Sequence, residues 1–162
     1  MQDQELIVVS ESAQIATPLQ LAGQAADIAA TADILGDYQR RKSEETLRRL
    51  GADIALLERF LQAAGVPVAD MASDLASWRG MSYGLVDGFV KWMLAEGYAI
   101  GSINVRLSSV KTYCTLAARA GYLDGHNLAL IKSVSGYRAS EGHNVDADRA
   151  RKRIATRRQG AK

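Results

Sequence analysis

The sequence lacks several features on which common protein classes depend. Its one cysteine, Cys114, excludes an internal disulfide and leaves a zinc cluster without a second thiolate. Only two prolines, Pro18 and Pro67, interrupt its 162 residues, so long helices are possible. The apolar patch at 6–9 is only four residues long and has no basic flank, which argues against a signal peptide. No run approaches the roughly 20 apolar residues that span a bilayer, so we expect a soluble, cytoplasmic protein without membrane contact.

Motifs for catalysis are also missing. The sequence contains neither a glycine-rich phosphate loop nor a nucleophile elbow. His126 and His143 have no other histidine or cysteine at metal-ligand spacing, and Cys114 falls on the apolar stripe expected for its helix. We therefore expect no enzymatic activity in this chain, no cofactor, no metal and no small-molecule substrate.

The net charge of +2 conceals a division along the chain. Residues 1–37 carry six acidic side chains and no basic one, whereas residues 38–162 carry all 20 basic side chains against 12 acidic ones, a net charge of +8. A basic body with an acidic N-terminal arm favours an anionic partner such as nucleic acid. An ordinary charged surface would explain the same composition.

Helical periodicity recurs along the chain, and strand patterns are nearly absent. We expect an all-α orthogonal bundle of four to five helices with flexible tails. Residues 1–18 form a disordered arm in this interpretation, 19–140 the helical domain and 141–162 a basic linker. The expected helices are residues 19–38, a helix capped by Ser43 that stops at Gly65, one from Ser82 to Gly97, one capped by Ser102 that ends at Gly121, and one over 126–134.

The helix that follows Ser43 has a polar face suited to DNA. Its apolar residues step by three and four, which leaves Arg48 and Arg59 on the opposite face with small alanines between them. Arginines flanked by small residues allow a phosphate backbone to approach closely. The expected contacts here, including the residues that precede the helix, are Arg41, Lys42, Ser43, Thr46, Arg48, Arg49 and Ala52.

The helix that follows Ser102 presents a second polar face, which contains no acidic residue. Hydroxyl and amide side chains beside Lys and Arg are typical of a helix in the major groove. A solvated face more often carries Glu and Lys in pairs four residues apart, although that alternative stays open. The outward residues are Asn104, Ser108, Lys111, Thr112, Thr115 and Arg119.

The order of these motifs resembles the core-binding domain of tyrosine recombinases, the phage integrase family. Ser43-x-x-Thr46 followed by apolar positions is similar to the family's opening helix. Ser102-Ile103-x-x-x-Leu107-Ser108-x-Val110-Lys111-x-Tyr113 is similar to a later one. The resemblance covers roughly residues 38–137, and the preceding helix is similar to one that some members use in subunit contacts. The chain departs from the family's pattern in having Lys111 where many members have Arg, and Leu128 where Pro commonly follows Asn.

The resemblance implies a SAM-like domain that grips duplex DNA at a recombination half-site, during DNA integration or site-specific recombination. It adds Ser102, Val105 and Arg106 to the DNA contacts. It also implies self-association of protomers on DNA through the N-terminal helix. The family's catalytic histidine motif, His-x-x-Arg, does not occur, so the expected parent protein carries its catalytic domain beyond the linker.

Two other function classes fit the same residues. A helical protein–protein adaptor would keep the bundle without binding DNA. A helix-turn-helix regulator is disfavoured, because the helix after Gly101 is expected to run for about 20 residues, which is long for a recognition helix.

Overall fold

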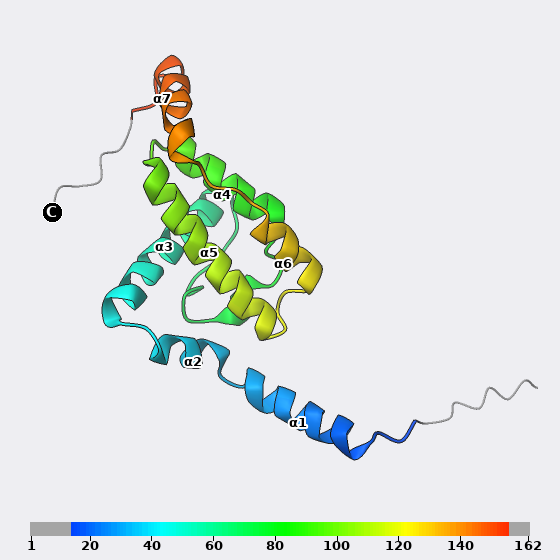
Figure 1. The fold of residues 1–162 in the computed structure, drawn as a ribbon. Coiled ribbons are helices and arrows are strands. Elements are labelled where there is room, and N and C mark those ends of the chain that lie inside the picture. The colour runs from blue at the N-terminus through cyan, green and yellow to red at the C-terminus, as the bar shows by residue number, and fades with distance from the viewer. Residues whose placement is uncertain (1–13, 156–162) are drawn as a thin grey trace, which may run out of the picture. The chain divides into compact units, whose positions relative to one another are not determined.

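The computed structural model describes residues 14–155, in which every regular element is helical (Figure 1). The absence of strands from this part of the chain confirms the predicted all-α class. The chain divides into two units after Ala30, so α1 is described separately from the bundle. The α-helices are α1 (Pro18–Thr31), α2 (Ile34–Arg40), α3 (Glu44–Ala63), α4 (Tyr83–Ala95), α5 (Ile100–Arg119), α6 (Gly125–Lys132) and α7 (Gly142–Arg151), with 3-10 turns at Leu75–Trp78 and Ala139–Glu141.

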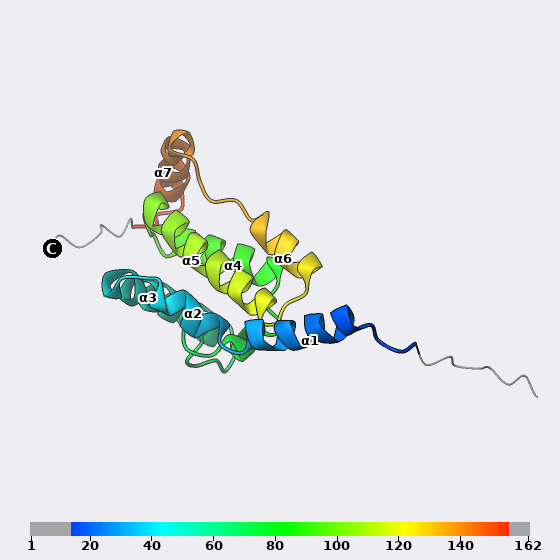
Figure 2. The same ribbon diagram turned by 60° about the horizontal axis from the view of Figure 1, so that its bottom comes forward.

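The bundle is built around α5, which packs against α2, α3, α4, α6 and the turn Leu75–Trp78. Figures 1 and 2 show α5 crossing the middle of the bundle, with α3 on one side and α6 on the other. The apolar stripe predicted for this helix has steps of four, three, four and three residues, and all of its members are buried. They are Ile103, Leu107, Val110, Cys114 and Ala117.

The α3 helix begins and ends where the sequence predicts. The Ser43 hydroxyl accepts a hydrogen bond from the Thr46 backbone N–H at 3.2 Å, which satisfies one of the unpaired donors of the first turn. The last turn closes at Ala64, and Gly65 follows with a positive φ of 85°, a conformation that favours glycine. Between these caps the leucine stripe lies in the core.

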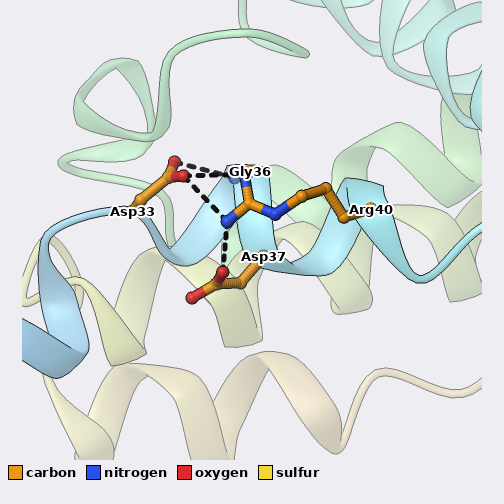
Figure 3. A network of polar contacts seen from close by, with 4 residues as sticks. All are labelled: Asp33, Gly36, Asp37 and Arg40. Atoms are coloured by element: carbon orange, nitrogen blue, oxygen red, sulfur yellow. Dashed lines mark hydrogen bonds and ion pairs between the residues drawn. The ribbon is translucent and has the colours of Figure 1, made fainter.

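The predicted helix over 19–38 is two helices, which corrects the sequence interpretation. Asp33 lies between them and begins α2, because its carboxylate accepts a hydrogen bond from the Gly36 backbone N–H at 3.1 Å. A Cβ at Gly36 would come within 2.3 Å of that carboxylate, so a larger residue there would displace the Asp33 side chain from its present position. Arg40 donates to Asp33 and also pairs with Asp37, closing the network in Figure 3. Helical periodicity alone did not reveal this second start.

The α1 helix buries none of its residues. Its start is a reciprocal cap in which Thr17 and Gln20 exchange side chain-to-backbone hydrogen bonds around Pro18. Large apolar side chains along this segment are exposed, including Leu21 and Ile28, which lie seven residues apart on one face. Of the predicted disordered arm, residues 1–18, the part up to residue 13 lies outside the described residues.

The start of α5 also differs from the prediction. The helix begins at Ile100 with Ala99 as its N-cap, so Ser102 lies inside the first turn instead of capping it. Ser102 is only 7% exposed. A serine followed by an apolar stripe fits either position, so the spacing of apolar residues alone did not fix the start of this helix.

The predicted linker, residues 141–162, is partly folded. Its first ten residues after Glu141 form α7, and the buried Arg149 fastens this helix to the bundle. The Arg149 guanidinium donates to the Leu94 carbonyl through Nε at 3.2 Å and Nη2 at 3.0 Å, and also donates to the Tyr98 carbonyl. These carbonyls lie at the C-terminal end of α4, where a cation compensates the helix dipole. Residues 156–162 lie outside the described part of the chain.

We predict that Arg149→Met detaches α7 from α4. A methionine keeps much of the side-chain volume but leaves the two carbonyls without their charged donor, which should lower the free energy of unfolding by about 1–3 kcal/mol. Amides of residues 142–151 should lose protection in hydrogen exchange while those of α5 keep theirs. Arg151→Met is the matched control, because Arg151 is exposed and pairs only with Asp148 among the described residues. Unchanged protection of α7 in Arg149→Met would contradict this account.

Candidate nucleic-acid interface

The α3 and α5 helices meet along a seam whose orientation is fixed by a buried polar contact. The Ser109 hydroxyl donates to the Asp53 carboxylate at 2.6 Å, and both residues are buried. Each helix buries its aliphatic stripe on one side of this contact. The residues on the other side of the contact therefore face solvent together.

That solvent side defines the α3–α5 face, which consists of Arg49, Ala52, Val105, Ser108 and Thr112. Arg49 lies one turn before Asp53 on α3, and Val105 lies one turn before Ser109 on α5. Thr112 is half-buried and the other four residues are exposed. The Arg49 side chain makes no hydrogen bond or ion pair to any other residue within 14–155. The face is therefore a shallow surface of small side chains with one available guanidinium.

Cationic side chains extend this face toward the N-terminal end of α3. Arg41 and Lys42 lie between α2 and α3 and are exposed. Lys42 sits over the Tyr38 ring, with its Nζ 5.1 Å from the ring centroid. Arg48 pairs with Glu45, but both side chains are about three-quarters exposed, so water screens this pair strongly. Arg48 can exchange that partner for a phosphate at little cost.

Two predicted contacts on α5 serve the fold instead. The Asn104 side chain donates to the Tyr137 carbonyl at 2.7 Å and accepts from the Tyr137 N–H at 2.8 Å. The Lys111 ammonium donates to the Lys132 carbonyl at 3.0 Å and to the Val134 carbonyl, at the end of α6. Both side chains hold the segment that leaves α6 against α5. Asn104, Lys111 and the buried Ser102 are therefore not available as exposed DNA contacts.

The predicted contact Arg106 lies at the inner edge of the seam. Its Nε is 3.8 Å from the Asp53 carboxylate, and its guanidinium lies over the Tyr98 ring at 4.7 Å. The side chain is 25% exposed, and its buried Nη1 has no hydrogen-bond partner within the described structure. Arg106 thus balances the Asp53 charge inside the bundle. The DNA contact that the resemblance implied for Arg106 is therefore not supported by an exposed guanidinium.

Sequence reasoning missed that Arg119 and Arg41 converge. They lie far apart in the chain, yet both line one hollow of about 210 Å³ where α2 packs against α5. Tyr38 and Leu116 line the same hollow. No local motif could indicate this meeting, because it depends on how α2 packs against α5.

The described residues provide little for covalent or metal chemistry. Burial raises the pKa of the Cys114 thiol to about 12, so the reactive thiolate is scarce at neutral pH. No group of three His, Cys, Asp or Glu side chains within 14–155 is placed to hold a metal ion. Over the same residues, no helix combines the length and the apolar character needed to cross a membrane.

Comparison of the chain with protein-family models, curated proteins and solved structures finds no match.

We predict that Asp53→Ala weakens the seam. The change leaves the Ser109 hydroxyl with only its longer hydrogen bond to the Val105 carbonyl, at 3.2 Å, and the partly buried Arg106 guanidinium without its counter-charge. It should lower the free energy of unfolding by about 1–3 kcal/mol in urea titrations. Asp146→Ala is the matched control, because it removes an exposed carboxylate from the helix α7. If Asp53→Ala is as stable as the parent chain, the seam does not depend on this contact.

Proposed function

We propose that the bundle binds duplex DNA through the α3–α5 face and the cations at the start of α3. The observation that carries the proposal is the composition of this surface. Exposed arginines without buried acidic partners surround small side chains on two helices held side by side. Guanidinium groups contact phosphates, while small residues between them allow the duplex close to the helices.

We propose further that the chain is the core-binding part of a tyrosine recombinase or integrase. The sequence resemblance over roughly residues 38–137 supports this, together with an all-α bundle whose α3 begins at Ser43 as the resemblance requires. In this assignment the DNA contacts are Arg41, Lys42, Ser43, Thr46, Arg48, Arg49, Ala52, Val105, Ser108 and Arg119. The chain itself would grip DNA without catalysing strand exchange.

We expect the full chain to bind duplex DNA with steep salt dependence. If the exposed cations neutralise about four or five phosphates, a plot of log affinity against log salt concentration has a slope near −4. Arg48→Ala/Arg49→Ala should lower affinity by about tenfold or more and flatten the slope by about 2, because two phosphate contacts are lost. Fluorescence anisotropy at several salt concentrations measures both quantities, and circular dichroism checks that helix content is unchanged.

Lys91→Ala/Lys132→Ala is the matched control for this experiment. It removes the same charge from exposed side chains on α4 and α6, away from the α3–α5 face. The control should keep most of the affinity. Equal losses in the two double variants would mean that DNA responds only to net charge, and the interface would be wrong. Absence of any salt-sensitive binding by the parent chain would favour a helical protein–protein adaptor.

We also propose that α1 joins protomers on DNA. The helix exposes Leu19, Leu21 and Ile28, and Ile15 precedes it, with fractional exposures of 56–93%. The apolar row of Leu21 and Ile28 on one face of α1 favours contact with another protein surface. The N-terminal helix in the related layout has this role. Because α2 belongs to the bundle and α1 does not, the two can be separated after Ala30.

Deletion of residues 1–30 should therefore abolish cooperative binding to paired half-sites and leave binding to a single half-site within about twofold. Leu21→Asp/Ile28→Asp should reproduce the deletion, because it places charges on the apolar row without shortening the chain. Gel-shift titrations on DNA with one and two half-sites distinguish the two effects. Cooperativity that survives both changes would show that α1 is not the protomer contact.

A further inference from the structure

The hollow between α2 and α5 differs from the rest of the surface in bringing two arginines together. Its lining residues come from α2, from the turn before α3 and from the end of α5: Ile34, Asp37, Tyr38, Arg41, Leu116 and Arg119. Arg41 and Arg119 are both exposed, and the side chain of neither makes a hydrogen bond or ion pair to another residue among residues 14–155. Two guanidinium groups at one concave site repel each other unless an anion lies between them.

The single acid that lines the hollow is already neutralised. The Asp37 carboxylate pairs with Arg40, which also binds Asp33, as Figure 3 shows. This network raises the pKa of Arg40 and keeps the Asp37 charge compensated within α2. Ile34 and Leu116 contribute apolar surface, which limits competition from water for any anion held there.

The hollow also lies at the end of the exposed edge of α5. Arg119 continues the row that begins with Val105, Ser108 and Thr112, at steps of three, four and seven residues. Arg41 stands two residues before Ser43, the N-cap of α3. The hollow is therefore contiguous with the surface assigned to DNA.

We propose that Arg41 and Arg119 together grip a single backbone phosphate of the bound duplex in this hollow. The proposal rests on the DNA-binding function above and adds a specific anchor to it. Guanidinium groups match phosphate oxygens with paired N–H donors, and two of them approaching from different helices fix the position of the phosphate as well as its charge. Such a contact sets the register of the protein on the duplex without reading a base.

Substitution of the DNA backbone tests this anchor directly. Neutral methylphosphonates are placed one at a time along a half-site duplex, and affinity is measured by anisotropy for the parent chain and for Arg41→Ala/Arg119→Ala. The parent should lose about tenfold at one position, and the double variant should be insensitive at that same position. The control Lys91→Ala/Lys132→Ala should keep the parent's sensitivity there.

The two arginines should also act as a unit. Because both contact one phosphate, Arg41→Ala and Arg119→Ala should be non-additive, and the double variant should flatten the log–log salt slope by about 0.9 instead of about 1.8. Additive losses with the larger change in slope would mean two separate phosphates and would overturn the proposal. Normal DNA binding with no position-specific difference between parent and double variant would overturn it too, while leaving the proposed function intact.

Inorganic phosphate distinguishes the source of the anion. In the parent chain, the Arg41 and Arg119 side-chain NMR signals should shift on titration with duplex at concentrations where inorganic phosphate causes little change. A chain that binds no duplex overturns both proposals. Shifts driven by inorganic phosphate in such a chain would instead assign the hollow to a free phosphate compound.

Discussion

The hydrogen bond from Ser109 to Asp53 is the contact on which the proposed interface depends. It is short and buried, and it joins the middle of α3 to the N-terminal half of α5. A buried carboxylate is tolerated only if donors and counter-charge surround it, and here Arg106 supplies the charge. Because this polar contact has one favourable geometry, it fixes the rotation of both helices, and hence which side chains reach solvent together.

Apolar periodicity was sufficient to predict the elements that pack by their leucine and valine stripes. It located α3 and α4 with their serine caps and identified the buried stripe of α5. It failed where a single polar side chain decides the structure. Asp33 starts a new helix inside an alanine-rich run, and Arg149 docks α7, which has almost no apolar face. Neither event changes the spacing of apolar residues, so neither leaves a periodic signal.

The polar faces were harder to interpret for a related reason. A lysine or asparagine on a solvent-facing position can bind a phosphate or can bind a carbonyl at the end of a neighbouring helix, and its spacing is the same in both cases. Lys111 and Asn104 bind carbonyls at the end of α6 and in the segment after it, contacts that the sequence did not predict. Gly136 allows this approach, because a Cβ there would come within 2.2 Å of the Asn104 side chain. Arg48 and Arg49 are exposed, and neither side chain donates to a backbone carbonyl within residues 14–155.

Under the proposed function, the exposed residues of α3 and α5 have different roles in DNA recognition. Phosphate contacts come from α3 and the turn before it, and from Arg119, so affinity and salt dependence reside there. The exposed part of α5 is left with Val105, Ser108 and Thr112, which are short and carry no charge. Such side chains reach base edges only if the helix backbone lies close to the groove floor. A phosphate anchored between α2 and α5 would hold the duplex in the position that brings this part of α5 near the bases, so the anchor and the reading surface would depend on each other.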